Sequence, residues 1–93
     1  MAEAVYQSKL KKAFEAQGWT VLKLSRLTVN GYPDLLLLHP VRGVAFVEVK
    51  GKGGRLSKLQ EYRINSLTAQ GFTALISGPD DYADTLAALG IAP

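Results

Sequence analysis

Residues 30–60 read NGYPDLLLLHPVRGVAFVEVKGKGGRLSKLQ, and this stretch decides the fold. It contains two apolar runs, residues 34–38 and 44–47, whose Leu, Val and Phe side chains are typical of buried strands. The Pro and Gly within residues 39–43, between the two runs, predict a hairpin turn. We therefore expect two antiparallel neighbouring strands, which brings Asp34 close to Glu48 and Lys50.

Charged side chains fall at the same end of both expected strands. Alternate residues of a strand share a face, so Phe46, Glu48 and Lys50 should point to one side. On an otherwise hydrocarbon sheet, a charge is costly unless it is paired or holds a metal. Asp34 and Glu48 can bind a hard cation such as Mg²⁺, while Lys50 can orient a water and balance charge on a phosphate. This arrangement favours metal-assisted hydrolysis of a phosphodiester.

The same residues resemble a known family. Pro33-Asp34 followed by Glu48-Val49-Lys50 is similar to the signature of the PD-(D/E)XK nucleases. Gly31-Tyr32-Pro33-Asp34, together with an early Glu3 and a Gln60 after the lysine, resembles the VRR-NUC branch in its stand-alone viral or bacterial form. The resemblance implies an α/β fold with a restriction-endonuclease-like core. This core is a mixed central sheet flanked by helices, in the order α-β-β-β-α-β-α.

The resemblance also implies roles for individual residues. It implies metal ligation, with Mg²⁺ or Mn²⁺ as the cofactor, by Asp34, Glu48, the Val49 carbonyl and, through water, Glu3. It further implies that Lys50 positions the attacking water and that Gln60 supports Lys50 or the water. The implied substrate is DNA, with the four-way (Holliday) junction as the expected branched form. Leu35 stands where some relatives have Arg after the Pro-Asp pair, so the resemblance does not extend to fine substrate preference.

Length and composition narrow the classes of protein. Ninety-three residues allow one domain with one modest core, residues 1–93. The absence of cysteine excludes disulfides and thiolate metal sites, and the single histidine, His39, excludes sites built on several imidazoles. No apolar run approaches the ~20 residues of a membrane span. The N-terminus lacks the apolar core of a signal peptide, so we expect a cytoplasmic protein.

Periodicity and turn residues predict the remaining elements. We expect helices over residues 3–17, 57–70 and 80–89, and further strands over residues 19–24 and 72–76, the latter buried. In the first helix, Tyr6, Leu10 and Phe14 form an apolar stripe, and we expect Glu3 on this buried stripe. The alternative for Glu3 is an acid that stabilises a helix N-terminus.

Gln60 has two possible roles. It follows Ser57 at the spacing of a capping box, in which its side chain would close the first turn of a helix. It also shares a stripe with Ile64 and Leu67, so its amide can face the cleft. The sequence leaves both roles open.

Positive charge is concentrated after the expected strand at residues 44–47. The chain carries a net charge of +3, and residues 50–63 contain several Lys and Arg with only Glu61 in opposition. We expect backbone phosphates of DNA to be held by Arg26, Lys52, Arg55 and Lys58, because phosphate contacts give affinity without sequence choice. The alternative for such charges is an ordinary solvated surface.

These observations predict a metal-dependent, structure-selective DNA endonuclease. The alternatives are a non-cleaving DNA-binding module on the same fold, or a nicking or flap nuclease of repair or restriction. One Asp-Glu-Lys centre cuts one strand at a time, so paired cuts in a junction predict a homodimer. Two candidate contact surfaces follow from the sequence: the first helix, through Val5, and the apolar residues within 86–91.

Overall fold

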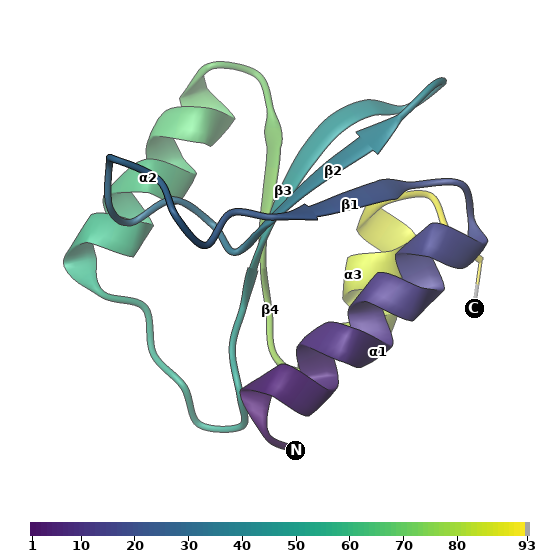
Figure 1. Cartoon of the computed structure of the whole chain (residues 1–93), viewed down its shortest axis with the longest axis horizontal. Helices are drawn as coiled ribbons and strands as arrows, with labels where there is room; N and C mark the ends of the chain where they lie inside the picture. The colour runs from purple at the N-terminus through teal and green to yellow at the C-terminus, as the bar shows by residue number, and fades with distance from the viewer. Residues whose placement is uncertain (93) are drawn as a thin grey trace.

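The computed structural model describes residues 1–92 and has the expected order of helices and strands (Figure 1). The elements are α1 (Glu3–Ala16), β1 (Thr20–Lys23), β2 (Leu35–His39), β3 (Gly43–Val49), α2 (Lys58–Ala69), β4 (Thr73–Ser77), the 3₁₀ turn η1 (Pro79–Asp81) and α3 (Tyr82–Ala88). The predicted fold class, an α/β fold with a mixed sheet flanked by helices, is confirmed. The 3₁₀ turn η1 takes the place of the first turn of the last predicted helix.

The sheet has four strands in the order β1-β2-β3-β4. β2 pairs antiparallel with β1 and with β3, and its register sets Leu35 opposite Val47. β4 runs parallel to β3, and α2 supplies the crossover that a parallel pair requires. Because β2 and β3 are antiparallel, Asp34, just before β2, lies at the same end of the sheet as Glu48.

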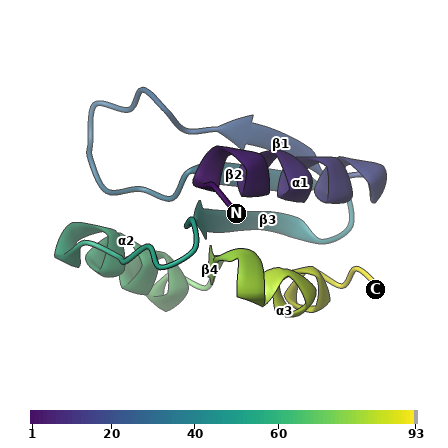
Figure 2. The same cartoon turned by 90° about the horizontal axis from the view of Figure 1, so that it is seen from below.

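Helices cover both faces of the sheet. In Figures 1 and 2, α1 and α3 lie on one side and α2 on the other. The side chains of the main core, buried between the sheet, α1 and α3, include Leu35, Leu37, Ala45, Val47, Val49, Tyr6, Leu10, Phe14, Leu86 and Leu89. Alternation along β3 then turns Phe46 and Glu48 toward the α2 side. This confirms the predicted division of β3 into an apolar face and a face that carries charge.

The boundaries of α2 follow from its sequence. Ser57 is the N-cap, and its hydroxyl oxygen accepts a hydrogen bond from the Gln60 N–H at 3.1 Å. The Gln60 side chain accepts in return from the Ser57 N–H at 2.9 Å, which completes the capping box. At the other end, Gly71 has a φ of +91°, which a residue with a side chain rarely adopts, and the helix stops. Within residues 1–92, no helix combines the length and the apolar character needed to cross a membrane.

The predicted burial of β4 is wrong. The residue before this strand, Phe72, is 39% exposed, and Ile76 within it is 45% exposed. β4 is the edge of the sheet and pairs with β3 alone, so one of its sides stays open to solvent. An apolar run of this length cannot distinguish an edge strand from a central one.

The expectation that the apolar residues within 86–91 form a second contact surface is also wrong. Leu86, Leu89 and Ile91 are all buried in the main core. After α3 the chain turns back, and the Ile91 N–H donates to the Leu86 carbonyl at 2.9 Å. This turn brings Ile91 under the sheet, so the C-terminal apolar residues complete the core instead of covering a partner.

Candidate active site

Asp34 is held where the β1–β2 loop enters the sheet. Its Oδ2 accepts a hydrogen bond from the Val49 N–H at 2.8 Å, and its carbonyl accepts from the Leu24 N–H at 2.7 Å. Gly31 precedes it with a φ of +87°, and a Cβ there would come within 2.5 Å of Leu59 Cγ. The glycine therefore allows the loop to pack directly against α2. This packing and the two hydrogen bonds fix the carboxylate beside the end of β3.

Glu48 is the buried acid of the site. Its side chain is 2% exposed, and its Oε2 lies 3.3 Å from Lys50 Nζ and accepts from Gln60 Nε2 at 3.2 Å. Its Oε1 is buried and has no hydrogen-bond partner among residues 1–92. Burial, with the nearby Asp34 carboxylate as the second cause, raises the pKa of Glu48 from 4.5 to about 7, although Lys50 acts in the opposite direction.

Lys50 and Gln60 complete the cluster. Lys50 Nζ donates to Gln60 Oε1 at 3.0 Å and also pairs with Glu48, so the ammonium group has a defined position. Gln60 Oε1 accepts from the Ser57 N–H as well, within the capping box. Both roles that the sequence left open for Gln60 are therefore present in the structure. The start of α2 and the Lys50 ammonium group are held by the same amide.

The donor groups of this cluster suit a small hard cation. Asp34 has one carboxylate oxygen engaged by Val49, and Glu48 has one buried oxygen without a partner, so each acid retains an oxygen for a ligand. Among residues 1–92, no group of three or more His, Cys, Asp or Glu side chains forms a metal site. A site with two carboxylates and water fits Mg²⁺, which commonly binds through one or two carboxylates and keeps several waters. The cluster accordingly fits the ion that the sequence implied.

Glu3 does not lie on the buried stripe of α1, and this expectation is wrong. Tyr6, Leu10 and Phe14 are buried, but Glu3 is exposed. It is the first residue of the helix, where the chain passes Gly51: a Cβ at Gly51 would lie 3.2 Å from the Glu3 backbone nitrogen. The stripe extrapolated from the helix interior fails there because the first residue of α1 lies against Gly51, beyond the end of β3 at Val49. Glu3 therefore lies next to the segment that follows Lys50.

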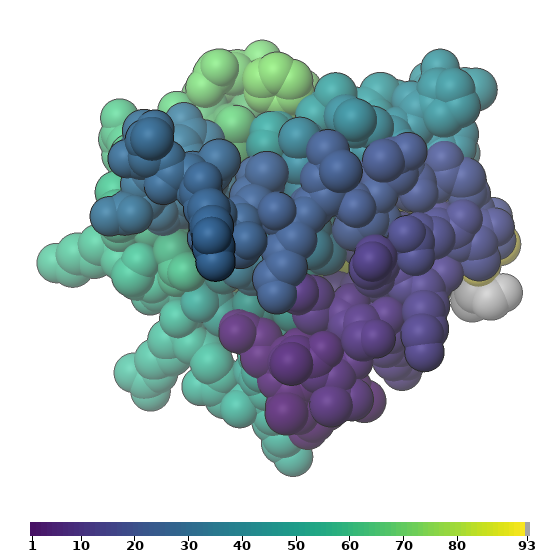
Figure 3. All heavy atoms as spheres, in the orientation of Figure 1, coloured from purple at the N-terminus to yellow at the C-terminus, as the bar shows by residue number. Residues whose placement is uncertain are grey.

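The predicted basic residues lie in segments that adjoin the site along the chain. Arg26, Lys52, Arg55 and Lys58 are all exposed. Lys52 and Arg55 belong to the segment between β3 and α2, Lys58 begins α2, and Arg26 belongs to the β1–β2 loop. On the face in Figure 3, this loop, the first turn of α1 and the segment after β3 lie around one part of the surface. Their charges can therefore act on one polyanion.

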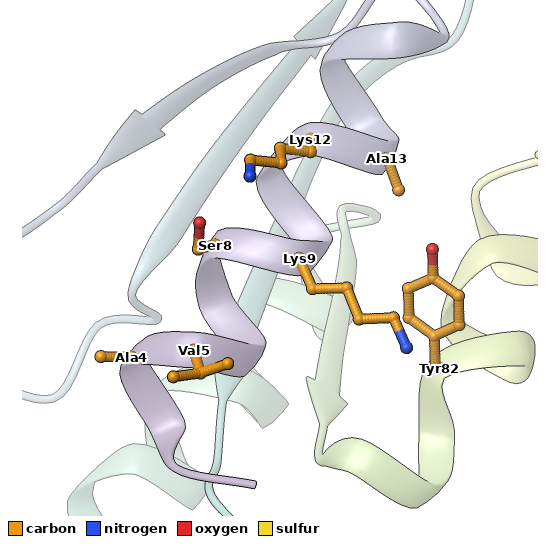
Figure 4. Close-up of a pocket in the computed structure, with 7 residues that line it drawn as sticks. All are labelled: Ala4, Val5, Ser8, Lys9, Lys12, Ala13 and Tyr82. Carbon is orange, nitrogen blue, oxygen red and sulfur yellow. The ribbon is translucent and has the colours of Figure 1, made fainter.

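A large surface hollow lies elsewhere. It has a volume of about 760 Å³ between α1 and α3, and it is lined by Ala4, Val5, Ser8, Lys9, Lys12, Ala13 and Tyr82 (Figure 4). Lys9 Nζ lies 4.1 Å from the centre of the Tyr82 ring. None of its lining residues is acidic, and none belongs to the Asp34–Glu48 cluster. This hollow is a surface feature of the helical face and not the site of the chemistry.

One residue near the site was predicted only as part of the basic segment 50–63 and received no role of its own. Arg63 follows Gln60 by three positions on α2, and its Nε donates to the Asn30 carbonyl at 3.0 Å. The i, i+3 spacing from Gln60 was a usable signal, because residues at that spacing share one side of a helix. The sequence could not reveal the contact with the loop, which depends on the fold.

The fold and the site together define a nuclease-type protein. The sequence profile of the VRR-NUC domain matches residues 3–77. A solved structure described as a VRR_NUC domain is 31% identical in sequence, with a TM-score of 0.82 over 94% of this chain and 95% of that chain. No curated protein gives a significant match. The chain belongs to the VRR-NUC domain family, and this family resemblance, predicted from Gly31–Asp34 and Glu48–Lys50, is confirmed. Its function is of the nuclease type and concerns DNA.

Proposed function

We propose that the chain is a metal-dependent endonuclease that cuts branched DNA, including four-way junctions. The observation that supports this most is the buried Oε1 of Glu48, which accepts no hydrogen bond from residues 1–92. The nearby Asp34 carboxylate adds a second negative charge and raises the pKa of Glu48 further. A carboxylate buried in this way needs a cation. Lys50 does not supply this cation for Oε1, because its ammonium group pairs with Oε2 of Glu48.

The residues of the site have separate roles. Asp34, Glu48 and the Val49 carbonyl would hold Mg²⁺ or Mn²⁺, with the exposed Glu3 acting through water. When bound, such an ion polarises the phosphate and lowers the pKa of a water. Lys50, held by Gln60 and Glu48, orients the attacking water and balances the charge that develops on the phosphate. Arg26, Lys52, Arg55 and Lys58 hold backbone phosphates and supply affinity.

The test is cleavage of labelled DNA with and without Mg²⁺. The panel contains a four-way junction, a flap, a single strand and a linear duplex, so the product pattern separates a junction-cutting enzyme from a flap or nicking enzyme. Asp34→Asn and Glu48→Gln should abolish cleavage, because loss of either acid removes a metal ligand. Lys50→Ala should reduce the rate by at least ~100-fold, the usual effect of losing one transition-state donor, yet leave Mg²⁺ binding intact.

Two results would contradict the proposal. Near-wild-type cleavage by Asp34→Asn or Glu48→Gln would show that the acids are not catalytic. A wild-type protein that binds every substrate but leaves all of them intact with Mg²⁺ or Mn²⁺ would favour the non-cleaving DNA-binding module.

A further inference from the structure

Arg63 is fixed between α2 and the β1–β2 loop. Its Nε donates to the Asn30 carbonyl at 3.0 Å, and its guanidinium carbon lies 4.9 Å from the centre of the Tyr32 ring. The same carbon lies 5.5 Å from the centre of the Tyr62 ring. A long side chain usually samples many rotamers, but these three contacts hold the guanidinium group in one place.

The charge of Arg63 is not neutralised by the protein. Within residues 1–92, the one ion pair joins Lys50 and Glu48, so Arg63 forms none with an acidic side chain. Arg63 is half-buried, and its hydrogen bond to Asn30 occupies Nε only. The other N–H groups of a guanidinium match a phosphate in a planar, two-pronged geometry. The group is therefore an anion-binding position that the protein has already oriented.

This position lies beside the candidate active site. Arg63 is three residues after Gln60, and side chains at this spacing are about 5–6 Å apart at Cβ on one side of a helix. Gln60 touches both Glu48 and Lys50. A phosphate on Arg63 would thus lie near a phosphate held at the acids.

Tyr62 adds an apolar surface next to this cation. Its side chain is 61% exposed, and Leu59, one turn earlier on α2, is 43% exposed. A continuous duplex turns phosphates and sugars outward and keeps its bases stacked inside, so along its length it offers such a ring no base face for stacking. An unpaired base exposes a flat face, and bases of every type stack on aromatic side chains.

We propose that Arg63 and Tyr62 form a binding site for an unpaired nucleotide of DNA, with the phosphate on the guanidinium and the base on the Tyr62 ring. The inference rests on the proposed function and deepens it by naming the substrate class. The site selects DNA that has unpaired nucleotides beside the cut, as at a flap or an opened branch point, over continuous duplex.

Binding without divalent cations tests this directly. The probes are an oligothymidine strand and a linear blunt-ended duplex with the same total number of nucleotides, each titrated by fluorescence anisotropy in EDTA over a range of salt concentrations. Tyr62→Leu should weaken binding of the single strand about 5- to 100-fold and leave binding of the duplex unchanged. Arg63→Gln should lower the slope of log affinity against log salt by about 0.7 on the single strand. Arg63→Lys should retain the slope, because it keeps the charge.

Matched controls lie at other places in the fold. Phe72→Leu removes another exposed aromatic ring, and Arg42→Gln removes an exposed arginine of the β2–β3 turn. Both variants should bind the two probes like the wild type. Equal losses on the two probes with Tyr62→Leu, or no loss on either, would overturn the proposal. So would an Arg63→Gln variant with a lower melting temperature and an unchanged salt slope, because Arg63 would then only fix the loop.

This test is independent of cleavage. If the wild type never cuts DNA in the presence of Mg²⁺ but Tyr62→Leu still loses the single strand selectively, the proposed nuclease activity fails and the nucleotide site stands. If the wild type cuts DNA and Tyr62→Leu affects binding of the two probes equally, the nuclease activity stands and the nucleotide site fails. Tyr62 is exposed, so its truncation should not unfold the chain and the comparison stays decisive.

Discussion

Burial and the nearby Asp34 raise the pKa of Glu48 from 4.5 to about 7. Folding therefore favours the neutral carboxyl over the carboxylate. The stability that this gives is fully present below the unfolded pKa of 4.5 and is lost as the pH rises through about 7. At neutral pH and without a cation, the acid that the proposed chemistry needs is thus a source of instability at the end of the sheet.

We predict that Glu48→Gln stabilises the metal-free protein at about pH 8. The amide keeps the shape of the side chain and removes a buried charge, which Lys50 balances at only one oxygen. The melting temperature should rise by about 4–8 °C, corresponding to ~1 kcal/mol in a domain of this size. The gain should shrink toward about pH 5, where the wild-type carboxyl is neutral. Thermal melts in EDTA at several pH values measure both effects.

Glu61→Gln is the control for this prediction, because Glu61 is an exposed acid of α2. It should not raise the melting temperature at any pH, because a carboxylate in the first turn of α2 stabilises the helix N-terminus. Added Mg²⁺ should stabilise the wild type but not Glu48→Gln, so the order of the two stabilities reverses when the metal is present. A Glu48→Gln variant that melts below the wild type in EDTA at every pH would refute this account of the buried charge.

At the scale of the element, α2 contributes both to the stability of the fold and to the position of Lys50 in the site. Ser57 and Gln60 close its first turn, and Gln60 also holds Lys50. Ser57→Ala removes only the cap and should reduce the free energy of unfolding by about 1 kcal/mol, with cleavage near the wild-type rate. Gln60→Ala removes the cap partner and the hydrogen bond to Lys50, so it should reduce both stability and turnover. Chemical denaturation and single-turnover cleavage separate the two variants, and a Ser57→Ala enzyme as inactive as Gln60→Ala would contradict this division.

The sequence predicted the elements whose signals are local. The alternation in residues 44–50 indicated which side chains of β3 face the core, and the spacing of Ser57 and Gln60 indicated the capping box of α2. The convergence of Asp34, Glu48 and Lys50 was predictable because a hairpin fixes the distance between its own strands.

Features that depend on distant partners were not predictable. The exposure of Glu3 depends on where the sheet ends under α1, and the exposure of Ile76 depends on β4 having a neighbour on one side alone. The burial of Ile91 depends on a turn after α3. The position of Arg63 against Asn30 required the β1–β2 loop to cross to the α2 side. Each of these is a relation between elements, and the local pattern does not contain it.

The segment between β3 and α2 allows an electrostatic prediction. Lys52, Arg55 and Lys58 are exposed, and they lie next to the site in the chain. Replacing all three with Ala should weaken DNA binding and lower the slope of log affinity against log salt by roughly 0.9 for each duplex phosphate that the protein no longer neutralises. Preference among sequences should hardly change, because phosphates carry no base identity. Titrations on two unrelated sequences measure this, and an unchanged slope would show that DNA binds on another face.

At the scale of the whole molecule, each chain has a single Asp34–Glu48–Lys50 cluster at one end of the sheet. One cluster cuts one strand, but a junction or a duplex break needs two cuts related by symmetry. A two-fold dimer meets this need with one gene product, and such dimers are the commonest oligomers. With Leu86, Leu89 and Ile91 buried in the core, the surface of α1 around Val5 is the remaining candidate interface from the sequence-based prediction.

We predict that the protein is a homodimer through this α1 surface. Val5 is 59% exposed and lines the hollow with Ala4 and Ala13, so two copies can bury apolar side chains there (Figure 4). Lys9 and Lys12 border the same hollow, and their repulsion across the two-fold axis should make the dimer tighter at higher salt.

Light scattering coupled to gel filtration should give a dimer for the wild type and a monomer for Val5→Glu. The Val41→Glu control places the same charge on an 87% exposed valine in the β2–β3 turn and should stay dimeric. Val5→Glu should still nick one strand of a junction but lose the paired cut. A wild-type protein that is monomeric both free and bound to junction DNA would overturn the prediction and favour a nicking enzyme.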